Sequence, residues 1–143
     1  MSRFVTLVCL ILVVFSTACS LKPITKETVR SNAEYQLEFT VDKPYQQVFA
    51  DLLANTKACY LLKPTSSEQL TVDGKRNNGK KSANITVEHV YAMAEHEVYL
   101  LIDLVSNTDN STGVVAYTSD YSARKRINAV KAWATSNDKS CQV

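Results

Sequence analysis

Alternation of apolar and polar residues is the feature that most restricts how this chain can fold. In Tyr35–Val41 and in Glu97–Ser106, every second residue is apolar. Side chains of a strand point to opposite faces in turn, so each segment predicts a strand with one buried face. Shorter stretches at 70–72, 82–91 and 114–119 extend the pattern. The sequence therefore predicts an antiparallel sheet of about five strands.

Two further segments carry apolar residues at helical spacing. The first follows Asp42 and Pro44 and should end within 57–60; Asp can accept hydrogen bonds from free N–H groups at a helix start, and Pro suits the first turn. The second follows the last strand. Its apolar side comprises Ala123, Ile127, Val130, Trp133 and Ala134. The expected order is β-α-β-β-β-β-α, an α+β, helix-grip-like domain over residues 35–143 with two helices on one face of the sheet.

The stretches between strands predict turns. Residues 73–81 contain Asp-Gly and Asn-Gly pairs, in which glycine adopts a positive φ at little cost.

The strand at 97–106 is interrupted by Asp103, which by alternation shares a face with Tyr99, Leu101 and Val105. We expect this face to be solvated; a polar anchor for a ligand is the alternative for Asp103.

The N-terminus has the features of a secretion signal. Arg3 supplies a positive charge, residues 4–15 form a twelve-residue apolar run, and the small residues Ser16-Thr17-Ala18 follow. A membrane-spanning helix needs about 20 apolar residues, so the run is short for a permanent N-terminal anchor helix, which is the alternative. This order of regions is typical of a cleaved signal peptide. We expect residues 1–18 to be removed by cleavage after Ala18.

Ser16-Thr17-Ala18-Cys19 is similar to the bacterial lipobox. The resemblance implies that the chain is a bacterial lipoprotein with diacylglycerol and palmitate on Cys19. Ser20 in place of Asp then implies the periplasmic face of the outer membrane. The cysteine count agrees, because Cys19, Cys59 and Cys141 remain after cleavage and lipidation of Cys19 leaves an even pair in an oxidising compartment. The alternatives are a free or intermolecularly bonded Cys19, or a eukaryotic secreted protein.

Residues 19–34 are polar without a clear period, which predicts a lipidated tether between Cys19 and the domain. The element order of residues 35–143 resembles that of the helix-grip modules in the C subunit of the β-barrel assembly machinery. This resemblance implies a fold among anchored periplasmic proteins and no particular activity.

The two remaining cysteines predict a disulfide. Cys59 lies at the end of the first predicted helix and Cys141 lies beyond the second, so the bond would close a loop of 83 residues. The chain-entropy model assigns such a loop roughly 4–5 kcal/mol of stabilisation. A nucleophilic cysteine with His89 or His96 as its base is the alternative, and no motif supports it.

No pattern in the chain favours an enzyme. There is no Gly-rich phosphate loop, nucleophile elbow or paired-carboxylate arrangement in the sequence. Glu95, His96 and Glu97 are successive, so in a strand they diverge and cannot share a metal ion. We expect no catalytic residue, no metal and no cofactor. Removal of the signal leaves 15 Lys and Arg against 14 Asp and Glu, which argues against a nucleic-acid partner.

Small basic clusters are the remaining candidates for a surface contact with the membrane or a partner. They comprise Lys75, Arg76, Lys80, Lys81, Arg124, Lys125 and Arg126. A basic side chain near an anionic bilayer adds about 1 kcal/mol, although such charges more often serve solubility alone.

The preferred function is that of a non-enzymatic accessory or scaffold module of the envelope, acting through contacts with an envelope protein. The alternative is a carrier or sensor of a small apolar ligand between the sheet and the C-terminal helix. The cavity for that ligand would be lined by Val98, Leu100, Ile102, Val114, Ala116, Ile127 and Val130.

Overall fold

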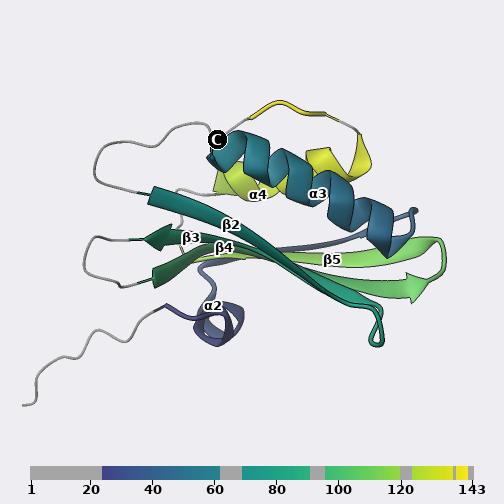
Figure 1. Cartoon of the computed structure of the whole chain (residues 1–143), viewed down its shortest axis with the longest axis horizontal. Helices are drawn as coiled ribbons and strands as arrows, with labels where there is room; N and C mark the ends of the chain where they lie inside the picture. The colour runs from purple at the N-terminus through teal and green to yellow at the C-terminus, as the bar shows by residue number, and fades with distance from the viewer. Residues whose placement is uncertain (1–23, 62–68, 91–95, 120–123, 137, 142–143) are drawn as a thin grey trace, which may run out of the picture.

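The computed structural model describes residues 24–61, 69–90, 96–119, 124–136 and 138–141 (Figure 1). The predicted signal and Cys19 lie outside these residues. The elements are α2 (Lys26–Asn32), β1 (Tyr35–Val41), α3 (Tyr45–Tyr60), β2 (Gln69–Asn77), β3 (Ser82–Val90), β4 (His96–Thr108), β5 (Ser111–Thr118) and α4 (Arg124–Thr135). From β1 onward the order is the predicted β-α-β-β-β-β-α, and the additional helix α2 precedes it.

The five strands form one antiparallel sheet in the order β1-β5-β4-β3-β2. Consecutive strands from β2 to β5 pair as neighbours, while α3 carries the chain from β1 at one edge to β2 at the other. Figure 1 shows α3 and α4 on one face of the sheet and α2 on the opposite face. The prediction of an α+β fold with two helices on one face is confirmed. We call the face that α2 contacts the outer face.

The main core lies between the sheet and the α3–α4 layer. Trp133 of α4 is 1% exposed, and Leu52 of α3 and Ile102 of β4 are fully buried. The start of α3 differs from the prediction in one respect. Pro44 is the N-cap and no side chain caps the helix, because Asp42 lies two residues too early to reach the free N–H groups of the first turn.

The hairpin of β2 and β3 is longer than expected. Gly74, predicted to lie in a turn, is within β2, where Leu53 and Phe49 of α3 lie against it. A Cβ at Gly74 would lie 2.9 Å from Cδ1 of Leu53, so this glycine is required for close packing rather than for a turn. The turn itself follows Asn77, and Lys81, rather than Gly79, has the positive φ, at 45°.

A β-bulge in β4 changes which residues share a face. Leu100 pairs with Val87 and Val98 pairs with Glu88, so Tyr99 is the extra residue. Tyr99 packs against the main core, whereas Val98 turns to the outer face. The prediction that Val98 shares a face with Leu100, and Tyr99 with Asp103, is therefore wrong. Simple alternation does not hold across a bulge.

Cys59 and Cys141 form a disulfide with an S–S distance of 2.03 Å. The bond joins the last turn of α3 to the segment that follows α4. The indole Nε1–H of Trp133 also donates a hydrogen bond to the carbonyl of Ser140 at 3.0 Å. The C-terminal segment is thus attached both to α3 and to α4.

Candidate contact surface on the outer face of the sheet

The short helix α2 packs on the outer face. Thr25 caps its first turn by accepting a hydrogen bond from the N–H of Thr28 at 3.3 Å. Val29 is 1% exposed and packs against Val98 and Leu101. Residues 26–32, which we expected to belong to the tether, are thus part of the folded domain.

An ion pair joins α2 to the middle of β4. The guanidinium of Arg30 donates two hydrogen bonds to the carboxylate of Asp103, at 2.7 and 2.9 Å. This bidentate geometry is the strong form of a charge-assisted hydrogen bond, and it raises the pKa of Arg30. Lys26 of α2 adds a longer hydrogen bond to the side chain of Asn84, at 3.4 Å. Asp103 is therefore a partner of α2 rather than a freely solvated side chain.

Sequence reasoning missed Arg30 because its partner is 73 residues away. A weak local signal for the helix was present. Thr25 is a good N-cap residue, Glu27 places a negative charge in the first turn and Arg30 places a positive charge in the last. Val29 is the single buried residue of α2. The sequence therefore lacks the repeated apolar positions that would have predicted an amphipathic helix here.

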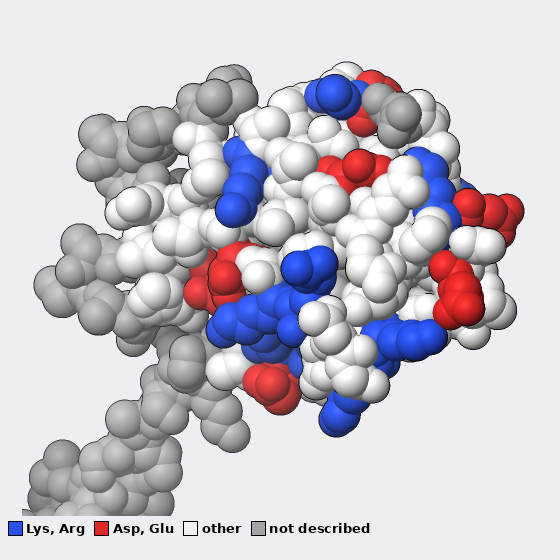
Figure 2. All heavy atoms as spheres, turned by 45° about the vertical axis from the view of Figure 1, so that its right-hand side comes forward, with Lys and Arg blue, Asp and Glu red and all other residues white. Residues whose placement is uncertain are grey.

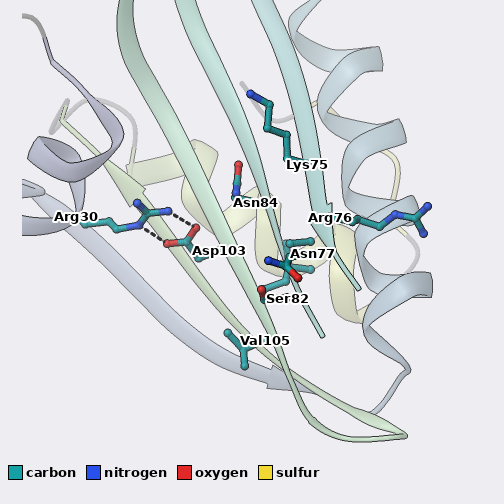
Figure 3. Close-up of a pocket in the computed structure, with 10 residues that line it drawn as sticks. Arg30, Lys75, Arg76, Asn77, Ser82, Asn84, Asp103 and Val105 are labelled. Carbon is teal, nitrogen blue, oxygen red and sulfur yellow. Dashed lines mark hydrogen bonds and ion pairs between the residues drawn. The ribbon is translucent and has the colours of Figure 1, made fainter. Parts of the chain in front are cut away.

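A groove of about 330 Å³ lies beside the ion pair. Figure 3 shows Arg30 entering it from α2, while the other labelled residues come from β2, β3 and β4. Its floor includes one cross-strand row, in which Lys75 pairs with Asn84 and Asn84 pairs with Asp103. The residues that line it are Arg30, Lys75, Arg76, Asn77, Ser82, Ala83, Asn84, Asp103, Leu104 and Val105.

The groove presents both polar and apolar groups that can contact a partner. It offers hydrogen-bond donors and acceptors on Asn77, Ser82 and Asn84, together with an apolar side chain, Val105, that is 51% exposed. Its lining contains neither histidine nor cysteine. Such a mixture of amide, hydroxyl and apolar groups is typical of the rim of a protein interface.

Among the described residues, the outer face carries more acidic than basic side chains. Its acidic members, including those of α2, are Glu27, Glu38, Asp73, Glu88 and Asp103, against the basic Lys26, Arg30 and Lys75. Two of the basic members are already committed, because Arg30 binds Asp103 and Lys75 lies 3.4 Å from Asp73. The face therefore offers no surplus of positive charge.

The predicted basic residues are dispersed over the molecule. Lys75 and Arg76 both border the outer groove, but the guanidinium of Arg76 lies on the helix side of the sheet, 5.5 Å from the ring centre of Phe49. Lys80 and Lys81 are at the β2–β3 turn, where Lys81 forms an ion pair with Asp109 at 3.1 Å. Figure 2 shows basic and acidic groups interspersed on the face in view.

The basic cluster of α4 lies on the helix side of the sheet. Arg124 stacks on the ring of Tyr35 at 5.5 Å, and Arg126 stacks on Tyr99 at 4.6 Å. Lys125 is exposed. Two of these three cations are therefore placed by aromatic rings, and none of them adjoins the outer groove.

The two histidines are separate. His89 packs edge-on against the ring of Tyr99, with ring centres 4.9 Å apart, and Nδ1 of His96 lies 3.5 Å from the carboxylate of Glu88. Among the described residues, no three His, Cys, Asp or Glu side chains are close enough to share a metal ion. Cys59 and Cys141 bond to each other, so neither is available as a nucleophile.

The residues proposed to line a ligand cavity are packed as core. Leu100 is 2% exposed, and Ile102, Val114, Ala116, Ile127 and Val130 are fully buried within one cluster that includes Trp133. A ligand-sized space would leave such side chains with accessible surface. Val98 lies on the other face of the sheet. The described core therefore gives no support to a carrier function.

No family model matches the chain, and no curated protein matches it. None of the described helices is long and apolar enough to cross a membrane.

Proposed function

We propose that this protein is an envelope lipoprotein, anchored through Cys19 at the periplasmic face of the outer membrane, that acts as a non-enzymatic accessory or scaffold module. It binds a protein at the membrane surface through the outer face of its sheet. The observation that supports this most directly is the hydrogen bond from the N–H of Val98 to the carbonyl of Ile24, at 3.0 Å.

This hydrogen bond makes the tether short. Only residues 20–23 separate Cys19 from Ile24. An extended chain spans at most about 3.6 Å per residue, so the lipidated residue lies within roughly 18 Å of the outer face. A lipid on Cys19 would hold the outer face and its groove toward the bilayer, with α3 and α4 on the far side.

The charge of the outer face favours a protein partner over lipid head groups. Anionic lipids attract clustered Lys and Arg, whereas the described part of this face has five acidic against three basic side chains. The exposed Val105 and the uncharged polar groups of the groove fit the surface of a membrane-proximal protein segment. The basic cluster of α4 would point away from the membrane.

Two measurements test the proposal separately. Labelling with a palmitate analogue should mark the wild type and not Cys19→Ala, and the intact mass should correspond to a chain that begins at an acylated Cys19. A photo-crosslinking amino acid at Val105 should then capture an envelope protein that the same probe at Lys131, exposed on α4, does not. An unlabelled wild type contradicts the anchor, while equal capture at both positions contradicts the outer face as the contact surface.

A further inference from the structure

The strand β2 forms one edge of the sheet and lies beside α3. Among the described strands it pairs only with β3, along all nine of its residues. It contains no proline, and the one bulge nearby is in β4. Natural edge strands are commonly protected by charged side chains, proline, bulges or covering segments, because their unpaired N–H and C=O groups can add another strand. The described β2 has charged side chains at Asp73, Lys75 and Arg76, but it carries neither a proline nor a bulge, so its charges would select a partner segment.

An apolar groove of about 390 Å³ lies along this edge, between β2 and α3. It is lined by Phe49, Ala50, Leu53, Ala54, Lys57 and Arg76. Phe49 and Leu53 also contact Gly74 in the middle of β2. A strand added beside β2 would direct every second side chain to the α3 side of the sheet, where Ala50 and Ala54 leave room for side chains of medium size.

Two cations border the groove. Lys57 is exposed near the end of α3, and Arg76 lies above Phe49 near the end of β2. Within the described part of the chain, neither Lys57 nor Arg76 forms an ion pair. A carboxylate on an incoming segment would therefore find partners at this edge, and the charges would select against a basic segment.

We propose that the β2 edge binds an extended segment of a partner protein by strand addition. The segment has apolar side chains of medium size at alternate positions, which enter the α3 groove, and an acidic residue that meets Lys57 and Arg76. Main-chain hydrogen bonds supply the affinity, and the groove with its two cations supplies the choice of sequence. This inference does not depend on lipidation at Cys19, and it names the class of partner segment that an accessory module of this kind would take.

The test uses the purified chain from Cys19 to Val143 and two ten-residue peptides. Both alternate Val and Thr; the first has Glu in place of two of the Val residues, on the face that meets α3, and the second has Lys at those positions. Hydrogen exchange read by mass spectrometry should show slower exchange of residues 69–77 with the Glu peptide, no change at the other edge strand, residues 35–41, and weaker protection with the Lys peptide.

Matched variants identify the groove. Ala50→Gln fills the groove with a neutral side chain and should weaken binding of the Glu peptide about tenfold. Ala58→Gln places the same side chain at an exposed position of α3 outside the groove and should leave binding unchanged. Lys57→Glu places a carboxylate beside Arg76 and should abolish the preference between the two peptides. Thermal unfolding of each variant shows whether it is folded.

Four results would overturn the proposal. They are no binding of the Glu peptide at millimolar concentration, equal protection of both edge strands, equal effects of the two alanine variants, and self-association through β2 without peptide. The last result would assign the edge to a second copy of the chain. None of these results depends on whether Cys19 is acylated, so they are distinguishable from failure of the anchor.

Discussion

The N–H of Val98 and the carbonyl of Ile24 are joined by a hydrogen bond of 3.0 Å, which attaches the start of the domain to the outer face of the sheet. The bulge at Tyr99 creates this contact, because it turns Val98 away from the main core and toward α2. A local irregularity of one strand therefore determines where the chain leaves the domain. The position of this exit sets which face of the domain an anchor at Cys19 would hold toward the membrane.

The ion pair between Arg30 and Asp103 should stabilise the docking of α2. In a double-mutant cycle of Arg30→Ala and Asp103→Ala, we expect a coupling free energy of about 0.5–1 kcal/mol. The value is small for a bidentate pair because the side chain of Arg30 is 37% exposed and screened by solvent. Denaturant unfolding measures the four free energies. The control is the same cycle with Glu27→Ala in place of Asp103→Ala. The carboxylate of Glu27 is 81% exposed and lies 3.8 Å from Arg30, so we expect no measurable coupling between these two residues. A coupling as large as that between Arg30 and Asp103 would contradict a specific role for Asp103.

Loss of the disulfide should destabilise the domain strongly. For Cys59→Ser with Cys141→Ser, the free energy of unfolding should fall by roughly 4–5 kcal/mol, since the bond no longer restricts the unfolded chain. Chemical denaturation of the oxidised wild type and the variant measures the difference. Cys19→Ser, which removes a cysteine outside the disulfide, should leave this free energy unchanged. Equal stability of all three proteins would show that the bond does not constrain the unfolded state.

Replacement of Tyr60 by Phe should not destabilise the protein at neutral pH. Tyr60 is 6% exposed, and its hydroxyl has no hydrogen-bond partner among the described residues. Removal of a buried polar group without a partner costs little. We expect Tyr60→Phe to change the free energy of unfolding by less than about 1 kcal/mol at pH 7. A larger loss would mean that the hydroxyl makes a stabilising contact.

Ionisation of Tyr60 should lower the stability of the protein at high pH. Burial raises the pKa of Tyr60 to about 12, although Arg126 opposes the shift. The folded state therefore favours the neutral phenol; this contribution to stability is fully present below pH 10 and is lost as the pH rises toward 12. Unfolding measured from pH 8 to 12 should show a smaller loss for Tyr60→Phe than for the wild type. Parallel curves would contradict the assignment.

Much of the fold was predictable because its signals are local. The alternation in Tyr35–Val41 and the helical spacing after Pro44 each depend on neighbours within one element. The disulfide followed from the number of cysteines and the absence of a catalytic motif. The structure contains the predicted order of strands and helices from β1 onward. It also contains the predicted disulfide.

The candidate contact surface was not predictable in the same way. Helix α2 buries one residue, Val29, and Arg30 pairs with a side chain 73 residues away. The bulge at Tyr99 has no signal in the sequence, yet it exchanges the faces of Val98 and Tyr99. Gly74 follows Asp73 and therefore resembled a turn residue. Its actual role depends on the close approach of Leu53, which is a tertiary contact. Each of these features depends on segments that meet only in the folded chain.

Paramagnetic relaxation measures which side of the domain faces the membrane. A nitroxide is attached at Val105→Cys on the outer face or at Lys131→Cys on α4, in the acylated protein bound to vesicles that contain a Ni²⁺-chelating lipid. We expect strong relaxation of the label at 105 and weak relaxation at 131. A flexible insertion of 20 Gly and Ser residues after Ser20 should make the two labels similar. Equal relaxation without the insertion, or stronger relaxation at 131, would contradict a short tether that holds the outer face toward the bilayer.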